Sequence, residues 1–335
     1  MKKIVIMCSI LLILFGCKAK NDLEIVDNFI NKVNKMKEYE LKGDLTIYDN
    51  EDKFNYDIKV NYLNNFYLVE MENISNNHIQ IILKNNEGLY VITPALNKSF
   101  KFDSNWPNNS SQSYILSALV NDIKNGSANI NSDKDQYIIE TKVNYPNNNN
   151  LSYEKIFLDL NGNLKKVNVY DEDDNLKIEM IINHLDNKTS LKEEDFNLEK
   201  YVTNEACEDE NCPKDTSVSI IENAIYPLFV PINTYLSSSE IVNDEISSRA
   251  IITFSGAKNY VLIEENAVLS PEPTILPVYG EPIMLNDTIA AFTSNSLNWT
   301  SGGINYYLAS EDLTPSEMVN IAQSLTNAQN VAYTK

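Results

Sequence analysis

The sequence predicts an α+β fold in which a sheet of antiparallel strands is covered by helices and followed by a smaller α+β domain. Segments of alternating apolar and polar residues follow one another between Asn- and Asp-rich turns, which is typical of an antiparallel meander. A helical pattern interrupts this series once. An acidic stretch with two cysteines then separates it from a C-terminal part with different turns. At 335 residues, the chain is long enough for two domains.

The composition excludes some classes of protein. A content of 43% apolar residues allows a packed core, so the chain is not disordered. Its 27 basic and 47 acidic residues give a net charge of −20, and Arg249 is the single arginine. Nucleic acid is therefore excluded as a partner, because binding to phosphates needs clustered cations. An anionic membrane surface would also repel this chain, so membrane contact requires an anchor.

Residues 1–16 have the pattern of a signal peptide, with Lys2 and Lys3 ahead of an apolar run that is too short to span a bilayer. The run ends in the letters LFGC, which resemble the lipobox of bacterial lipoproteins. This predicts a diacylated Cys17 and a lipid anchor on the extracytoplasmic face of the cell membrane. Phe15 departs from the small residue usual in that motif. The alternatives are an uncleaved signal anchor and a plain secretory signal with a free cysteine.

The first domain is predicted to span 17–203. It begins with a helix that Asn21 or Asp22 caps, and the apolar stripe of this helix contains Val26, Phe29 and Val33. Period-two alternation then predicts strands over Tyr39–Tyr48, Phe54–Tyr62, Phe66–Met71 and His78–Leu83. In such a meander, one face of the sheet is exposed to water, and the other, the dry face, is apolar and buried.

The stretch 87–123 combines strand, turn and helix signals. It predicts strands over Leu89–Thr93 and Phe100–Phe102, then a loop with Trp106. A helix over 112–124 follows. Its predicted N-cap is Ser110 or Ser111, its predicted stop is a left-handed Asn125-Gly126, and its apolar face contains Leu116, Leu119, Val120 and Ile123.

Four more strands are predicted after this helix, over Gln136–Tyr145, Tyr153–Leu160, Leu164–Tyr170 and Leu176–His184. Asn161-Gly162 is a strong two-residue turn signal. Because the helix connects the two series of strands, we expect it to cover the dry face of the sheet.

The segment 204–216 is predicted to be an acidic linker between domains. It contains Cys207 and Cys212, the two cysteines that remain in an exported, acylated chain. A local disulfide is the simplest state of such a pair. Free thiols and a metal site are the alternatives, although no further soft ligand lies nearby.

The segment 217–335 is predicted to be a second, smaller α+β domain. Hairpins are expected at 249–264 and 297–309, the latter around a Gly302-Gly303 turn. Thr314 and Glu317 form a capping box at the start of a C-terminal helix.

The letters TPALNKSFKFDSNWPNNSSQSYIL, read with the strands on both sides, resemble Gram-positive (Firmicute) lipoproteins related to the LolA/LolB lipoprotein-carrier superfamily. Some of these are sporulation or germination lipoproteins. The resemblance covers about 22–200 and implies an antiparallel half-barrel, closed by helices, around an apolar cavity for acyl chains. The C-terminal part resembles a small domain of unknown function that is appended to such lipoproteins. The order of the two domains is also similar to that of RseB-type regulators of an anti-sigma factor.

The candidate cavity residues are the apolar side chains expected on the dry face, together with the loop tryptophan and the helix stripe. They are Leu45, Ile47, Tyr56, Ile58, Leu68, Ile81, Val91, Trp106, Leu116 and Leu119. Each is equally an ordinary core residue if the half-barrel is filled. Trp106 is either a gate to the cavity or a plug packed on the core. Alternation alone does not decide which face of the sheet each side chain occupies, since a shift of one residue in register exchanges the two faces.

Catalytic signals are weak. His78 and His184 fall on predicted strands, and none of the common nucleophile, phosphate-loop or zinc motifs is present. The acidic run 171–174 lacks the spacing of a calcium loop and reads as a solvated turn. We therefore expect no enzyme, no cofactor and no metal.

Two functions fit these expectations. The first is a lipid-anchored binding protein that holds a lipid, an acyl chain or a lipidated peptide in the half-barrel. The second is a regulatory or scaffold lipoprotein that engages an envelope, sporulation or anti-sigma-type protein partner, which its acidic surface would help to recognise.

Overall fold

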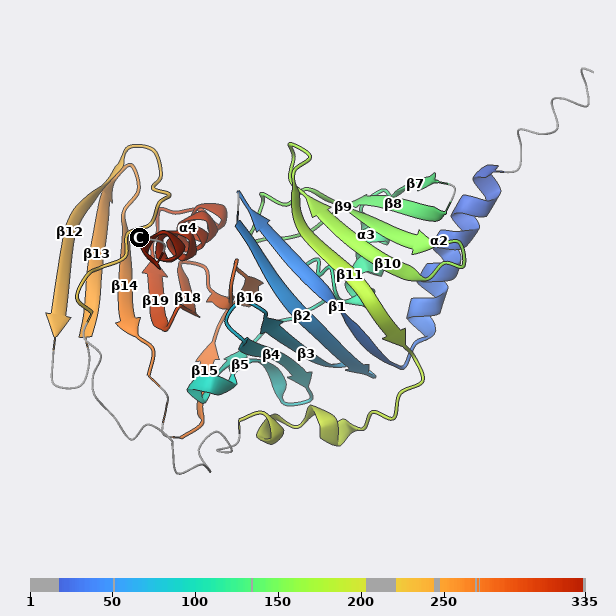
Figure 1. The fold of residues 1–335 in the computed structure, drawn as a ribbon, viewed down its shortest axis with the longest axis horizontal. Helices are drawn as coiled ribbons and strands as arrows, with labels where there is room; N and C mark the ends of the chain where they lie inside the picture. The colour runs from blue at the N-terminus through green and yellow to red at the C-terminus, as the bar shows by residue number, and fades with distance from the viewer. Residues whose placement is uncertain are drawn as a thin grey trace, which may run out of the picture.

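The computed structural model describes residues 18–333, apart from positions 51, 134, 203–220, 244–247, 269 and 271, with side chains from position 23 to position 325. Within this part the chain forms two sheets and three α-helices (Figure 1). The first sheet is large and curves around two of the helices, and the second is smaller and packs on the third. The predicted α+β class, a half-barrel sheet covered by helices and followed by a smaller α+β domain, is confirmed.

The first sheet has twelve strands in the order β15-β6-β5-β4-β3-β2-β1-β11-β10-β9-β8-β7, and every pair except β15 and β6 is antiparallel. Its strands are β1 (Glu38–Asp49), β2 (Asp52–Leu63), β3 (Phe66–Asn73), β4 (His78–Asn85), β5 (Gly88–Thr93), β6 (Lys98–Phe102), β7 (Asn129–Ser132), β8 (Gln136–Lys142), β9 (Tyr153–Asp159), β10 (Leu164–Tyr170), β11 (Leu176–Asp186) and β15 (Thr274–Val278).

The second sheet has seven strands in the order β12-β13-β14-β19-β18-β17-β16. Its strands are β12 (Thr234–Asn243), β13 (Ser248–Gly256), β14 (Tyr260–Asn266), β16 (Glu281–Met284), β17 (Ile289–Phe292), β18 (Ser296–Ser301) and β19 (Ile304–Ala309). The strands predicted from alternation are all present. The sequence did not predict β7, β12, β15, β16 or β17.

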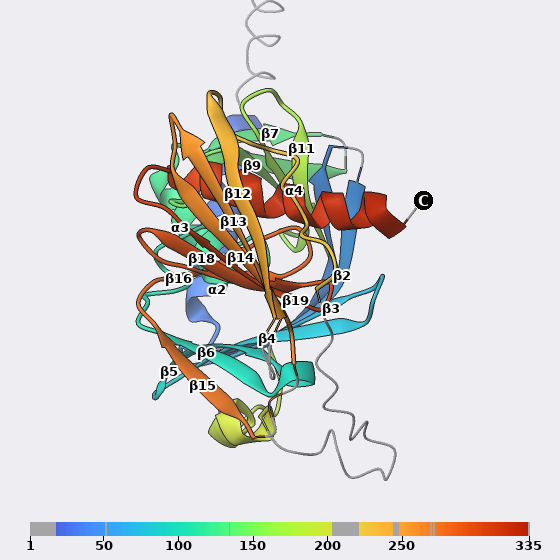
Figure 2. The same cartoon turned by 90° about the vertical axis from the view of Figure 1, so that its left-hand side faces the viewer.

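The helices α2 (Lys18–Lys35) and α3 (Leu116–Asn125) bury their apolar stripes in the core of the first sheet, and α4 (Pro315–Tyr333) lies across the second sheet (Figure 2). Three 3₁₀ turns complete the elements: η1 (Pro94–Leu96), η2 (Glu193–Phe196) and η3 (Leu198–Lys200). None of the helices in the described part of the chain combines the length and the apolar run needed to cross a membrane.

The first sheet bends where β1 passes β11. A bulge interrupts their register between Lys42 and Gly43. A Cβ atom on Gly43 would lie 2.0 Å from the carbonyl oxygen of Ile181, so only glycine allows this close approach.

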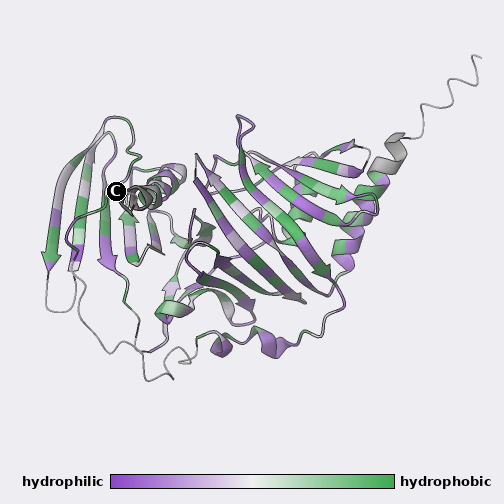
Figure 3. Cartoon of the chain, viewed as in Figure 1, coloured by the Kyte–Doolittle hydropathy of each residue, from purple (hydrophilic) through white to green (hydrophobic). Residues whose placement is uncertain are grey.

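Buried and exposed residues alternate along the long strands β1 and β2, and bands of differing hydropathy run across the strands of Figure 3. The strands β3, β4 and β5 differ because they are covered on both faces. One face joins the core with α3, and the other forms a separate cluster in which Phe196 and Leu198 of the 3₁₀ turns cover the sheet. The burial of β5 is therefore nearly continuous.

The second domain docks directly onto the first sheet. Its strand β15 adds to the edge strand β6 in parallel. Gln80 on β4 accepts a hydrogen bond from the backbone N–H of Ile289 at 2.6 Å, and the hydroxyl of Tyr56 donates to the carbonyl of Asn286 at 2.7 Å. Ile289 and Ala291 belong to the apolar core of the first sheet. The two domains thus share one packed junction.

The predicted caps of the two helices of the first domain were wrong, although α3 ends at Asn125 as expected. Asn21 and Asp22 lie inside α2. Helix α3 begins at Leu116 rather than at 112, because Ser111 pairs with Asn144 through its backbone N–H and its Oγ, at 2.7 Å each, and is not available as a cap. Gly126 has φ −91° and is not left-handed. It is needed for close packing instead, since a Cβ there would lie 2.1 Å from the Thr141 hydroxyl.

Two other local predictions were confirmed. Thr314 and Glu317 form the capping box of α4, with the Glu317 carboxylate accepting from the Thr314 backbone N–H at 2.8 Å. Gly302 and Gly303 connect β18 to β19 with φ values of 54° and 78°, the left-handed region that favours glycine.

Candidate functional site

Eight of the ten predicted cavity residues meet in the core of the first domain. They are Leu45, Ile47, Tyr56, Ile58, Val91, Trp106, Leu116 and Leu119. Leu68 and Ile81 do not join them. These two side chains lie on the opposite face of the sheet, in the cluster that contains Phe196. Their neighbours Tyr67, Val69 and Ile82 face the helices instead, a one-residue difference that alternation could not resolve on strands covered from both sides.

The interior of the half-barrel is filled in this structure. Side chains around a hollow would be exposed to the void, yet the eight grouped residues are 0–6% exposed. Trp106 is 1% exposed, and its ring packs edge-on against Tyr67 with the ring centroids 5.6 Å apart. Its backbone carbonyl accepts from the Lys84 ammonium. Trp106 is thus packed on the core in this structure, as the plug alternative expects.

A cavity of about 410 Å³ lies where the two domains meet. One wall comes from β1, β11 and the loops of the first domain, and the other comes from β16 and α4. The apolar part of its surface contains Ile47, Leu151, Ile178, Pro282, Ile283, Met284, Leu285 and Val319. The polar part is rich in side-chain amides, from Asn109, Gln112, Asn147, Asn148, Asn149, Asn150, Asn320 and Gln323. Both domains thus contribute apolar side chains and hydrogen-bonding amides to the lining of the cavity.

The charges around this cavity are mostly negative. Asp49, Asp171, Glu172, Asp173 and Glu281 line it, with Lys177 as a cation. Asp171 is held in its turn, because its carboxylate accepts from the backbone N–H groups of Asp173 and Asn175 at 3.0 and 2.8 Å. The acidic run is therefore part of a hairpin tip at the rim. No group of three or more residues suited to binding a metal ion occurs among the described positions.

Two buried carboxylates lie next to one wall of the cavity. Burial raises the pKa of Asp122 on α3 to about 7. Burial, and then the neighbouring Asp122, raise the pKa of Glu154 on β9 well above its ordinary value. Tyr145 lines the cavity, and burial, followed by the nearby Glu154 and Asp122, raises the pKa of its phenol. Asp122 and Glu154 thus form a buried pair of acids near this wall, and their raised pKa values favour the protonated forms.

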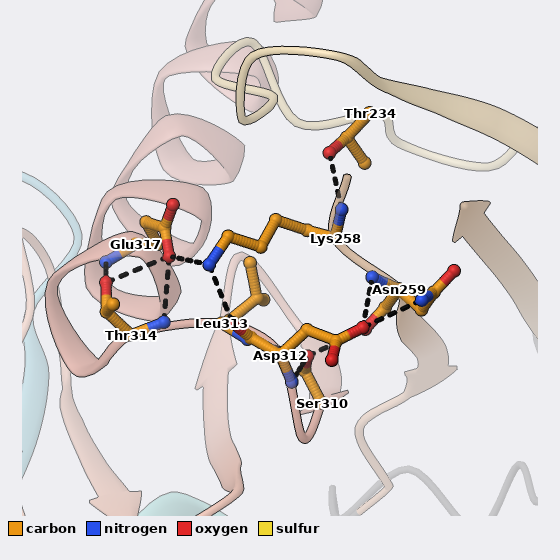
Figure 4. A network of polar contacts seen from close by, with 8 residues as sticks. All are labelled: Thr234, Lys258, Asn259, Ser310, Asp312, Leu313, Thr314 and Glu317. Carbon is orange, nitrogen blue, oxygen red and sulfur yellow. Dashed lines mark hydrogen bonds and ion pairs between the residues drawn. The ribbon is translucent and has the colours of Figure 1, made fainter. Parts of the chain in front are cut away.

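The surroundings of His78 and of a polar network in the second domain are those of structural residues. His78 is half-buried, and burial lowers its pKa. In the second domain, Lys258 bridges the Asp312 carbonyl and the Glu317 carboxylate (Figure 4). Hydrogen bonds from the side chain and backbone of Asn259 hold the pKa of Asp312 below its ordinary value. This network joins the start of α4 to the β13–β14 loop.

Sequence reasoning missed most of the cavity. The letters YPNNNNL at 145–151 were not assigned to a site, although their run of amides was a visible signal. The signal for Glu154 was clearer. It lies at every second position with Ile156 and Leu158 along the strand, so it shares their inward face. Cys17, Cys207 and Cys212 lie outside the described residues, as does the predicted linker 204–216.

Comparisons with known proteins found similar solved structures and one similar sequence. No family model matches it. A chain of the Pseudomonas aeruginosa MucA/MucB complex is similar with a TM-score of 0.33 and 10% identity, over 89% of this chain and 97% of that one. A putative outer membrane lipoprotein-sorting domain from Vibrio parahaemolyticus is similar with a TM-score of 0.35 and 14% identity, over 56% of this chain and 100% of that one.

The LolA superfamily protein NE2245 from Nitrosomonas europaea has a TM-score of 0.33 and 10% identity, over 53% of this chain and 98% of its own. Sequence similarity is much stronger to the sporulation protein YdcC of Bacillus subtilis (strain 168). The two are 32% identical over 317 residues, which cover 94% of this chain and 93% of YdcC. The chain belongs to the family of the sporulation protein YdcC.

Proposed function

We propose that this protein is a lipid-anchored, extracytoplasmic binding protein that holds an acyl chain, free or carried on a peptide, in the cavity between its two domains. The observation that carries the proposal is the cavity itself, which is lined by both apolar side chains and side-chain amides. Its volume of about 410 Å³ falls within the range of roughly 300–1,000 Å³ that is usual for ligand pockets.

The cavity at the junction is a better candidate than the interior of the half-barrel. Leu45, Ile58 and Leu119 are at most 2% exposed and already fill that interior. In contrast, Ile178 and Met284 line the junction cavity and are only half-buried, which leaves apolar surface for a ligand. An acyl chain would cover this surface, and the amides would hydrogen-bond to a carboxylate or peptide group next to it.

The chemistry of the lining suits binding. Its side-chain amides can each donate and accept hydrogen bonds with a ligand. The B. subtilis relative is named a sporulation protein. We extend the proposal to that process, with the bound acyl group belonging to an envelope component.

Filling the cavity should block binding. Ile178→Trp adds bulk to the apolar wall and should weaken binding of a fluorescent fatty acid at least tenfold, with little change in melting temperature because the side chain is only half-buried. The matched control is Ile181→Trp. Ile181 lies on the same strand, on the opposite face, and is 40% exposed. The affinity of the Ile181→Trp control for the fatty acid should equal that of the wild type.

The binding measurement uses residues 18–335, with a free fatty acid and the same fatty acid on a short peptide as separate ligands. The ligand that binds more tightly identifies the physiological form. Mass spectrometry of the gently purified protein should also detect an acyl compound. Equal binding by both tryptophan variants, or no binding by the wild type, would contradict the proposal.

The lipid anchor depends on Cys17. We expect Cys17→Ser to abolish labelling by a palmitate analogue in cells, because this pathway acylates only the first cysteine after the signal peptide. The control is Cys207→Ser, which should keep the label. Labelling that persists in the Cys17 variant would show that the anchor is elsewhere.

A further inference from the structure

The outer edge of the second sheet is bare and apolar. Strand β12 is the edge strand, and no other described strand pairs with its outer side. Nine of its ten residues are exposed. Of the 18 large apolar residues that are exposed in the described part of the chain, eight lie within positions 226–242, which include most of β12. An unpaired edge strand surrounded by exposed apolar side chains is a ready site for another strand.

The apolar side chains of β12 lie on both faces of the sheet. Leu236 is opposite Phe254 of β13, which belongs to the core beneath α4, and Ile241 shares this face. Tyr235 and Val242 lie on the other face. A partner that covers this edge must therefore present a bare strand with apolar groups on both of its faces. A second copy of the chain has this arrangement.

We propose that two copies of this chain associate through β12, which pairs with itself in antiparallel orientation across a two-fold axis at Ser239. The bulge that follows Leu236 supplies one extra residue in each strand. Leu236 then lies opposite Ile241 of the second copy on one face, and Tyr235 lies opposite Val242 of the second copy on the other. The two seven-stranded sheets become one continuous sheet.

The distribution of charge favours association at this edge. The chain has a net charge of −20, so two copies repel each other wherever their acidic surfaces meet. Glu240 is the single charged residue within positions 226–243. With the axis at Ser239, Glu240 lies opposite Ser238 of the second copy and not opposite another Glu240, which avoids a pair of like charges. Strand β12 also lacks the lysine and proline that commonly protect edge strands.

The apolar surface is large enough for a stable dimer. The eight exposed residues within 226–242 are 36–86% exposed. If a large side chain presents about 150–250 Å² in full, together they expose on the order of 800 Å². An interface of standard size buries roughly 800 Å² on each partner. The edge also lies at the end of the molecule opposite α2, so the first domain does not obstruct a second copy (Figure 1).

Sedimentation velocity of residues 18–335, which contain both domains, tests the association. The wild type should be dimeric at about 100 µM and dissociate on dilution. Added salt should strengthen the dimer, because it screens the repulsion between two chains of charge −20. A wild type that stays monomeric at every concentration would overturn the proposal and leave this edge to a strand of a different protein.

Charged substitutions test the register. Leu236→Lys with Ile241→Lys brings lysines opposite each other across the axis and should weaken association at least tenfold. Leu236→Lys with Ile241→Glu brings each lysine opposite a glutamate of the second copy and should associate more tightly than the double-lysine variant. The matched control is Ile79→Lys with Ile181→Lys, at residues of the first sheet that are 41% and 40% exposed. This control should associate at least as tightly as the wild type, because it only lowers the net negative charge.

Cross-linking locates the axis. Ser239→Cys, in a chain that also carries Cys207→Ser and Cys212→Ser, places two cysteines directly opposite each other, at a Cα separation of about 4.5–5.5 Å that suits a disulfide. Mild oxidation should then produce a covalent dimer. Tyr307→Cys in the same background, at a residue of β19 that is 39% exposed, should not. Equal cross-linking at both positions, undiminished association by the folded double-lysine variant, or equal association by the two charged variants would each overturn the proposal.

Discussion

Trp106→Ala should lower the free energy of unfolding by about 3–5 kcal/mol, as expected for a fully buried large side chain. Trp106 is 1% exposed and ends a row of aromatic rings that runs through Tyr67 and Tyr62 to Tyr39, with centroids 4.9–5.6 Å apart. Removing the indole would leave a cavity between the loop and the sheet. The surrounding strands are fixed by their hydrogen bonds and cannot close it.

The measurement is denaturant unfolding of residues 18–335, wild type beside variant. Trp106→Phe is the matched control and should lose less, because it keeps an aromatic ring against Tyr67. Fatty-acid binding is measured on the same samples and should change little, because Trp106 does not line the cavity at the domain junction. A small loss of stability with weaker fatty-acid binding would restore the role of a gate.

The second large effect is on the pH dependence of stability. Burial raises the pKa of Asp122 from its ordinary value to about 7, and raises that of Glu154 as well. A raised pKa in the folded state contributes stability below the unfolded pKa, and this stability is lost as the pH rises through the folded pKa. For Asp122 the window runs from about pH 4 to about pH 7. The loss should be of the order of 3 kcal/mol in the absence of ligand.

Unfolding free energies of the wild type, Asp122→Asn and Glu154→Gln between pH 4.5 and pH 8 check this effect. The wild type should lose stability relative to both variants as the pH rises, because the neutral amides cannot ionise. Asp195→Asn is a control without an effect in this range. Hydrogen bonding to the Lys192 backbone and then to the Lys200 side chain lowers the pKa of Asp195, so its contribution is lost only below about pH 4, and the difference between this variant and the wild type should stay constant from pH 4.5 to pH 8. If the stability curves of the wild type and Asp122→Asn run parallel across this pH range, the pKa of Asp122 is not raised in the folded state.

Local patterns in the sequence determined much of the first domain. Alternation identified β1, β2 and β9, because each of these strands has one face on the core and the other less buried. The helix that crosses between the two series of strands was also predicted, because its apolar residues recur with helical spacing. The capping box of α4 and the Gly302-Gly303 turn are set by residues within a few positions of each other. Such features depend on short-range geometry.

Only the tertiary structure decided which residues meet over long sequence distances. Leu68 and Ile81 turned to the far face because η2 and η3, more than a hundred residues later, cover β3–β5. The parallel addition of β15 to β6 and the burial of Ile289 joined the second domain to the first. Asp122 and Glu154 look in sequence like ordinary acids on a helix and a strand. Their raised pKa values come from desolvation, which depends on everything packed around them and on no local pattern.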